Sequence, residues 1–189
     1  MEEKFFSILI DLNARFQPEE RFDLEDALTM ILEKFEMGEV DGGGTRCAAN
    51  GEIMGCDITV FIYKEKFEGN PAKAFDSLSG ILAKLGIPKG SRLVCGEETR
   101  EVGTLEGLAF YANGRELPRE VYASCDINFV IEEMGLCMEG VGRFYSYWEG
   151  EEETALYFYG TSYQKMYECI ERMVEEYPLC QKSRIVQIA

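Results

Sequence analysis

The sequence NARFQPEE at residues 13–20 recurs as NGRELPRE at residues 113–120, with Asn, Arg, Pro and Glu in the same four places. The two copies lie 100 residues apart in a chain of 189 residues. A match at this distance indicates a tandem duplication in which each copy is long enough to form a core of its own. The sequence therefore predicts two similar units, at residues 1–98 and 99–189.

Two shorter matches follow in the same order. EMG at residues 36–38 recurs at residues 133–135, and SRLV at residues 91–94 recurs as SRIV at residues 183–186. Their offsets are 97 and 92 residues, so the second copy has lost a few residues along the way.

Hydrophobic periodicity gives the first unit the order strand, helix, strand, strand, helix, strand. Alternating apolar residues predict strands, and apolar residues three or four apart predict helices. We expect Asp23 to cap the first helix and Gly38 to end it, and Pro71 and Gly86 to bound the second helix. The predicted elements are a strand at 6–12, a helix at 24–35, a hairpin turning at 49–52, a helix at 72–85 and a strand at 93–94.

The second unit repeats this order, with Gly135 expected to end its first helix and Ser162 to cap its second. Its elements are a strand at 105–111, a helix at 127–134, a hairpin at 144–159, a helix at 163–177 and a strand at 185–188, after a polar connection at 96–104. The order βαββαβ resembles the ferredoxin-like unit, in which two helices cover one face of a four-stranded antiparallel sheet. The resemblance implies an α+β fold of two tandem ferredoxin-like units, and it implies no particular function.

The formal charge of −16, from 35 acidic and 19 basic residues, restricts the partners. It disfavours nucleic acid, whose binding depends on phosphate contacts, and it disfavours anionic membrane surfaces. A basic protein partner would be attracted, although the charge alone is also compatible with a role in solubility. The start MEEK has no signal-peptide pattern and no apolar run is as long as a membrane span, so we expect a cytoplasmic protein.

The chain contains no histidine, which excludes serine and cysteine triads that use histidine and metal sites built on it. No phosphate loop or dinucleotide-binding motif is present, so we expect no cofactor and no bound metal. Seven cysteines are expected to be reduced. Cys47 and Cys56 flank the predicted turn and could lie near each other across the hairpin, where a disulfide is possible but disfavoured by the expected compartment.

An aromatic hairpin in the second unit is the main candidate site. Tyr145 and Tyr147 alternate along its first strand, and Tyr157 and Tyr159 alternate along its second, so one side is predicted to carry all four. The helix-covered side would then take Phe144, Trp148, Leu156 and Phe158. The tyrosines would lie on the open face, joined by Tyr111, either as a binding patch or packed against the first unit or a second chain.

The repeated loops supply two further candidates, Arg15 and Arg115. Each follows the first strand of its unit and precedes the first helix. One interpretation is a turn in which the arginine pairs with a glutamate; the other is a paired recognition loop.

In its size, acidity and lack of catalytic motifs, the chain resembles bacterial immunity proteins that neutralise a cognate toxin. This resemblance implies a non-enzymatic protein that binds a basic partner, and a homodimer is compatible with it. The alternative is a small-molecule sensor or regulator that uses a cleft between the units. An enzyme would have to rely on carboxylates, tyrosines or a thiolate.

Overall fold

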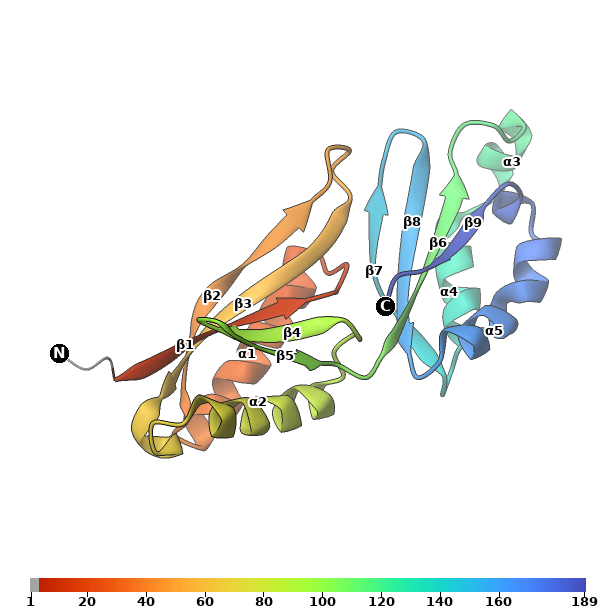
Figure 1. Cartoon of the computed structure of the whole chain (residues 1–189). Coiled ribbons are helices and arrows are strands. Elements are labelled where there is room, and N and C mark those ends of the chain that lie inside the picture. Colours follow the sequence, from red (N-terminus) through yellow and green to blue (C-terminus); the bar gives the residue numbers. More distant parts are fainter. Residues whose placement is uncertain (1–3) are drawn as a thin grey trace. The chain divides into compact units, whose positions relative to one another are not determined.

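The computed structural model describes residues 4–189 and consists of two compact units. The first unit comprises residues up to Cys47 together with Ile53–Thr104, and the second comprises Ala48–Glu52 together with Leu105–Ala189. Each unit contains an open antiparallel sheet with helices on one face, as Figure 1 shows. The predicted α+β fold with two ferredoxin-like units is confirmed.

The first unit is built on a five-stranded sheet with the strand order β2-β3-β1-β4-β5, in which every pair is antiparallel. Its first four strands have the ferredoxin-like order. The elements are β1 (Phe5–Leu12), α1 (Pro18–Lys34), β2 (Gly38–Cys47), β3 (Ile53–Tyr63), the short 3-10 helix η1 (Lys64–Phe67), α2 (Pro71–Leu85), β4 (Ser91–Cys95) and β5 (Glu98–Val102).

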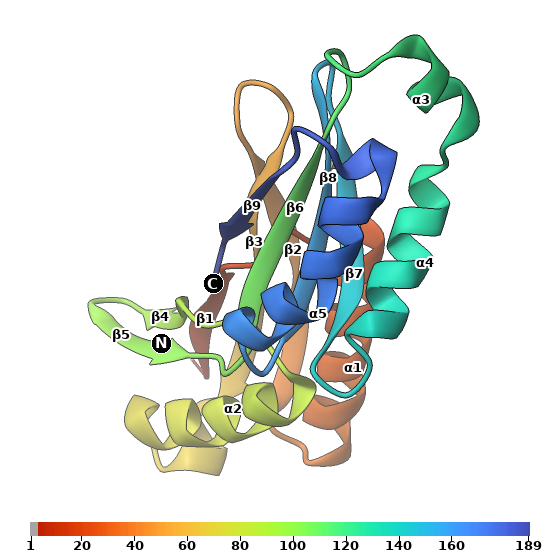
Figure 2. The same ribbon diagram turned by 90° about the vertical axis from the view of Figure 1, so that its right-hand side faces the viewer.

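The second unit has a four-stranded sheet with the order β7-β8-β6-β9. Helices α4 and α5 run beside each other over one face of it (Figure 2). The elements are β6 (Glu106–Asn113), α3 (Arg119–Ser124), α4 (Ile127–Cys137), β7 (Gly142–Glu149), β8 (Glu153–Gly160), α5 (Tyr163–Glu176), the 3-10 helix η2 (Pro178–Cys180) and β9 (Arg184–Gln187). Within residues 4–189, no helix has both the length and the apolarity needed to cross a membrane.

Each unit has its own core between the sheet and the helices. In the first unit Ile10, Leu28 and Leu78, from β1, α1 and α2, are fully buried. In the second unit Phe110 of β6 and Ile170 of α5 are fully buried. Burying a side chain of this size contributes about 1.5–3 kcal/mol, so the predicted apolar faces are what hold the helices to the sheets.

Strand register in the two sheets is consistent with the offsets of the sequence repeats. Ile10 of β1 pairs with Leu93 of β4, and Phe110 of β6 pairs with Ile185 of β9. Phe110 follows Ile10 by 100 residues and Ile185 follows Leu93 by 92, which are the offsets of the sequence repeats. The two pairs of strands are therefore equivalent, residue by residue.

The expectation that Gly38 and Gly135 both end a helix is wrong. Gly38 is the first residue of β2, whereas Gly135 lies inside α4, which continues to Cys137. The apolar residues after Gly135 extend the helix by another half turn. The residue that begins the corresponding strand in the second unit is Gly142.

Three other features differ from the predictions: the division between the units, the start of α1, and an additional helix. The division between the units falls after Thr104, not after residue 98, because Glu98–Val102 forms a hairpin with β4 and completes the first sheet. Asp23 does not cap α1 and lies within it, since Pro18 already takes the first helical turn. Helix α3 was not predicted. Pro71, Gly86 and Ser162 bound their helices as expected.

Candidate functional site

Three of the predicted tyrosines lie on the face of the second sheet that is turned away from its helices. Leu156 and Phe158 of β8 belong to the core beneath the helices, so the alternating Tyr157 and Tyr159 take the opposite face. Tyr111 of β6 lies on this face too, with its ring 6.5 Å from that of Tyr157 in an edge-on arrangement. All three tyrosines are buried.

A β-bulge in β7 overturns the prediction for Tyr147. Phe144 pairs with Phe158 and Ser146 pairs with Tyr157, so Tyr145 is an extra residue between two paired positions. The bulge reverses the alternation that follows it. Tyr147 therefore shares the helix-covered face with Leu156, where its side chain is 50% exposed, and does not join the other tyrosines.

The bulge also moves Trp148 to the face opposite to the one predicted. It pairs with Ala155 and so lies on the face of Tyr157, not on the helix-covered face that the sequence predicted for it. The predictions for Phe144, Leu156 and Phe158 are confirmed.

Tyr145 forms a stack with two other side chains at the end of β7. Its ring meets Tyr159 edge-on at 5.2 Å, and the guanidinium carbon of Arg143 lies 4.4 Å from the ring centre. Arg143 Nη2 also donates a hydrogen bond of 2.7 Å to the Tyr145 hydroxyl. Because the guanidinium has several N–H donors and Arg143 is exposed, it keeps the capacity to bind an anion.

A hollow of about 530 Å³ adjoins this stack, and it will be called the glycine-lined hollow. Glycines occupy four of the positions around it, and at two of them, Gly135 and Gly140, an added Cβ would meet nothing within 4 Å. Its lining consists of Leu105, Gly135, Leu136, Glu139, Gly140, Val141, Gly142, Arg143, Tyr145, Tyr159, Gly160 and Thr161.

Two of these glycines are required by close packing. A Cβ at Gly142 would collide with the thioether of Met166, and a Cβ at Gly160 would collide with the carbonyl oxygen of Val141. Gly135 differs from them, because a Cβ added there meets nothing within 4 Å. Close packing therefore does not require a glycine at this position of α4, and a larger side chain would have room there.

The lining is largely apolar, and Arg143 is its one cation. Leu136 is 65% exposed and Tyr159 is almost fully buried, so the hollow has an apolar wall and an aromatic floor. Glu139 and Thr161 are the other polar side chains, and no cysteine or lysine is among the lining residues. The arrangement suits binding of an apolar body beside a cation, and it offers no paired nucleophile and base.

Tyr111 and Tyr157 take part in hydrogen bonds inside the second unit. Both hydroxyl groups donate to Glu52 Oε1, at 2.5 Å and 2.9 Å. The Arg184 guanidinium lies 3.4 Å from the centre of the Tyr111 ring and donates bonds of 2.9 Å and 2.7 Å to Glu153. These bonds hold the pKa of Glu153 below its usual range. Such contacts give the two tyrosines a structural part, while their role in binding stays a prediction.

Arg15 and Arg115 occupy equivalent places and fasten the repeated loops to the hairpins. Arg15 Nη1 donates 2.8 Å to the carbonyl oxygen of Ile53, at the start of β3. Arg115 Nε donates 3.1 Å to the carbonyl of Glu151, and its Nη1 lies 2.7 Å from the Glu152 carboxylate, just before β8. The pairing with glutamate that the sequence predicted is present for Arg115. A recognition role for the loops stays a prediction.

No cysteine lines the glycine-lined hollow. Cys47 pairs with Ile53 and Cys56 pairs with Thr45, so the two cysteines are not directly opposite each other in the hairpin. All seven cysteines are free. Burial raises the pKa of Cys56 to about 12 and that of Cys180 to about 11, which keeps both thiols protonated. In residues 4–189, no three side chains among Cys, Asp and Glu are grouped so as to hold a metal ion.

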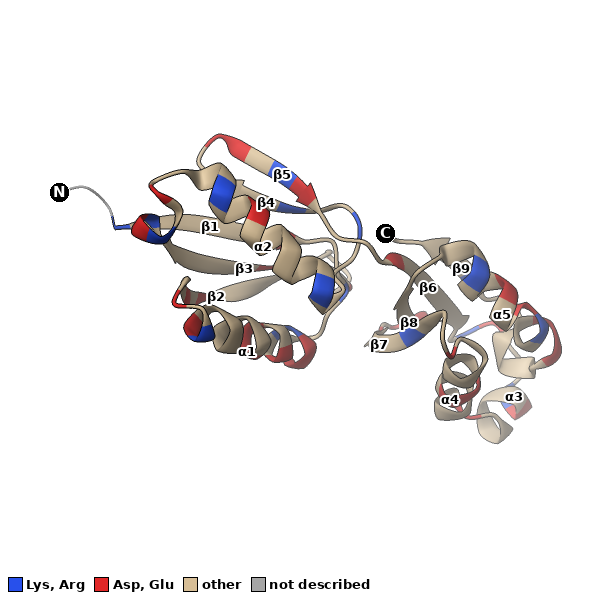
Figure 3. Ribbon diagram, turned by 90° about the horizontal axis from the view of Figure 1, so that it is seen from below, with Lys and Arg blue, Asp and Glu red and all other residues tan. Residues whose placement is uncertain are grey.

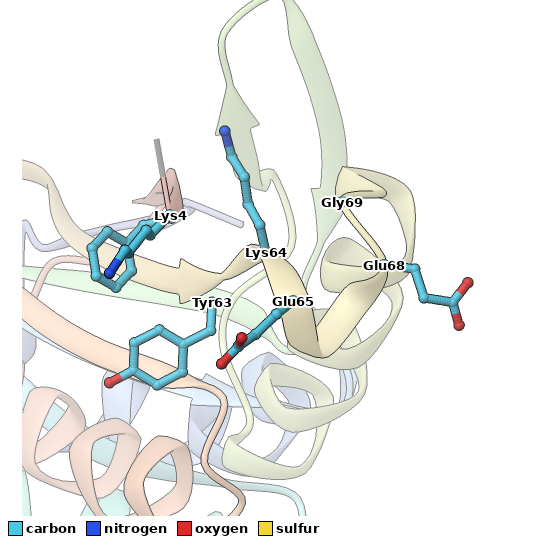
Figure 4. Close-up of a pocket in the computed structure, with 7 residues that line it drawn as sticks. Lys4, Tyr63, Lys64, Glu65, Glu68 and Gly69 are labelled. Carbon is cyan, nitrogen blue, oxygen red and sulfur yellow. The ribbon is translucent and has the colours of Figure 1, made fainter. Parts of the chain in front are cut away.

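A larger hollow of about 870 Å³ lies beside η1 in the first unit, between Lys4, Tyr63 and Glu65. Figure 4 shows that the side chains of Lys64 and Glu68 extend in different directions, away from those of Tyr63 and Glu65. Its charged groups therefore do not converge on a common point, in contrast to the stack beside the glycine-lined hollow.

Sequence reasoning found Tyr145 and Tyr159 but missed Arg143 and Leu136. The only signal in the sequence was a pair of glycines, Gly135 and Gly140, shortly before Arg143. What the sequence did not reveal is that these glycines surround one space, because they come from α4, the following loop, β7 and β8.

No protein-family model matches the sequence, and no curated protein matches it. Among solved structures, a protein of Fusobacterium nucleatum that is provisionally assigned as a monooxygenase is 9% identical over 99% of this chain and 92% of that chain, with a TM-score of 0.31. A heme-binding protein of Thermus thermophilus is 14% identical over 97% and 89% of the two chains, with a TM-score of 0.30. An anthrone oxidase-like protein is 13% identical over 100% and 95%, with a TM-score of 0.24. Values this low leave the function to be inferred from the residues of this chain.

Proposed function

We propose that the chain is a non-catalytic binding protein whose second unit holds a small molecule in the glycine-lined hollow. The ligand has an apolar or aromatic body and one acidic group. The observation that carries this proposal is a space kept free of side chains directly beside the stack of Arg143, Tyr145 and Tyr159.

The size and lining of the hollow support a small molecule. Its volume of about 530 Å³ falls within the range of about 300–1,000 Å³ typical of ligand sites. Leu105, Leu136 and Val141 supply aliphatic surface, and Tyr145 supplies an aromatic wall. Apolar contact would provide most of the affinity, since each Å² of apolar surface removed from water contributes roughly 25 cal/mol.

The presence of Arg143 is the reason for proposing an acidic group on the ligand. The chain as a whole carries a charge of −16, so an anion approaching it is repelled at long range. A cation at the site itself is needed to offset this repulsion. The guanidinium of Arg143 provides it, and the hydrogen bond to Tyr145 holds it in place.

The test compares two fluorescent probes with nearly the same aromatic body. Anilinonaphthalene sulfonate carries an acidic group, and N-phenyl-1-naphthylamine is neutral. We expect Arg143→Gln to weaken binding of the sulfonate by about tenfold, because a hydrogen bond to a charged group contributes about 1.5–3 kcal/mol. Binding of the neutral probe should be unchanged.

Arg119→Gln is the matched control, because this exposed arginine of α3 lines neither this hollow nor the depression between α4 and α5. It should change neither dissociation constant. The proposal is wrong if Arg143→Gln affects both probes equally, or if it behaves like the control.

A further inference from the structure

A second apolar depression lies on the helical side of the second unit, between α4 and α5, which run beside each other in Figure 2. It will be called the α4–α5 groove, and its volume is about 390 Å³. Its lining comes entirely from these two helices and the residue after α5: Phe129, Glu133, Cys137, Cys169, Arg172, Met173, Glu176 and Tyr177. It shares no residue with the glycine-lined hollow.

The groove exposes the aromatic ring of Phe129, which is not part of the core cluster. Phe129 of α4 is 43% exposed, and its ring lies 5.1 Å from that of Tyr177. Met173 of α5 continues the apolar floor and is half-buried. A cluster of this kind is typical of the anchor region of an interface, where a partner fills an apolar depression.

The charge around the groove selects the partner. The two helices carry six glutamates against two cations, and Figure 3 shows acidic residues on both of them. The glutamates are Glu132, Glu133, Glu168, Glu171, Glu175 and Glu176, and the cations are Lys165 and Arg172.

Arg172 does little to offset this acidity, because its Nε lies 3.0 Å from the Glu176 carboxylate. Like charges facing each other across an interface are destabilising, so a second copy of this acidic chain would be repelled. A segment with Lys or Arg beside its apolar residues is complementary.

We propose that the α4–α5 groove docks a basic amphipathic helix of a partner protein. The apolar side chains of this helix contact Phe129, Met173 and Tyr177, and its lysines or arginines lie over the glutamates at the rim. Docking of this kind uses anchors at positions i, i+3, i+4 and i+7 of the bound helix. The proposal is independent of the small-molecule site.

The test uses three model peptides of about four helical turns. The first has leucines on one face and lysines on the other; the second has the same composition with the leucines dispersed; the third has glutamate in place of lysine. By fluorescence anisotropy on the full chain, only the first should bind with appreciable affinity. Equal binding of the second would overturn the proposal, because it would show attraction by charge alone.

Phe129→Ser should weaken binding of the first peptide by at least tenfold, and Phe35→Ser should leave it unchanged. Phe35 is the matched control because it is 53% exposed and belongs to the first unit. Glu133→Lys is a second variant that leaves the apolar surface intact and should also weaken binding. If neither Phe129→Ser nor Glu133→Lys weakens it, the groove is not the docking site.

Thiol alkylation can show where on the chain the peptide binds. Cys137 is exposed and lines the groove, whereas Cys47 is exposed on β2 of the first sheet. Saturating peptide should slow alkylation of Cys137 and leave that of Cys47 unchanged. Equal rates at Cys137 with and without peptide would overturn the proposal, as would a stable homodimer that Phe129→Ser dissociates.

Discussion

Asp11 marks a position at which the two sheets differ. In the first sheet Asp11 pairs with Arg92, and in the second sheet Tyr111 pairs with Arg184. The arginine is retained in both, but its partner has changed from a carboxylate to an aromatic ring. The Asp11 carboxylate lies 2.6 Å from Arg92 Nη2 and 2.8 Å from Arg46 Nη2, and its side chain is only 14% exposed.

These ion pairs make stability depend on pH. Burial works to raise the pKa of Asp11, but hydrogen bonds and charges from Arg92 and Arg46 outweigh it, so the pKa lies below its usual value of 3.8. A carboxyl with a lowered pKa stabilises the fold above its unfolded pKa, and this contribution is lost as the pH falls through the folded pKa. We expect Asp11→Asn to lower the free energy of unfolding by about 1–2 kcal/mol at pH 7.

Urea unfolding at pH 7 and pH 3 measures this effect. The difference between wild type and Asp11→Asn should shrink at the lower pH, where the wild-type carboxyl begins to protonate. Asp57→Asn is the control, because Asp57 is 3.8 Å from Arg46 and more exposed, so its effect should be smaller. A difference that is the same at both pH values would show that the charge of Asp11 is not the cause.

Strand β7 is the element in which sequence periodicity failed. Strict alternation predicts Tyr145 and Tyr147 on one face, and it holds along β8, where no residue is inserted. The extra residue at Tyr145 cannot be predicted from the apolar pattern, since tyrosine and tryptophan suit either face of a sheet. Arg143 and Tyr145 precede the shift in register and keep the ordinary alternation, so both lie beside Tyr159 in the stack at the glycine-lined hollow.

Because Tyr157 and Tyr147 lie on opposite faces of the sheet, replacing each with alanine should lower the free energy of unfolding by different amounts. Tyr157→Ala should lower the free energy of unfolding by about 3–5 kcal/mol, because Tyr157 is fully buried. Tyr147→Ala should cost less than about 1 kcal/mol, because half of its side chain is already exposed. Chemical denaturation of the two single variants measures both. Equal costs would show that Tyr147 lies on the same face as Tyr157 and that the bulge is misplaced.

At the scale of the whole molecule, the duplication made the fold predictable. Pairs such as Ile10 with Leu93 and Phe110 with Ile185 follow from the offsets, because strands with clear alternation keep their register. The ends of helices and the inserted elements could not be predicted from these offsets, as Gly135 within α4 and the added strand β5 show. Of the residues at the candidate site, only the tyrosines were predicted from the sequence. The glycines come together through tertiary packing, which local sequence patterns do not indicate.

The net charge predicts how the whole chain responds to salt. A charge of −16 opposes the compact state by self-repulsion, and this repulsion is screened as salt is added. The midpoint of thermal unfolding should rise between about 0.05 M and 0.3 M NaCl and then level off, because the Debye length at about 0.1 M is already near 10 Å. A midpoint that falls with salt would instead show that exposed ion pairs dominate.

The central claim is that the glycine-lined hollow binds a ligand, and Gly135→Leu tests it most directly. The new side chain enters open space and fills the hollow, while replacing glycine inside a helix should raise the free energy of unfolding by about 0.5–1 kcal/mol. Gly80→Leu in α2 is the matched control, because a Cβ there also meets nothing within 4 Å. The decisive measurement is the dissociation constant of anilinonaphthalene sulfonate for the two variants. The structure predicts an increase of at least tenfold for Gly135→Leu and no change for Gly80→Leu; a stable Gly135→Leu protein that binds the probe like wild type would contradict the proposed site.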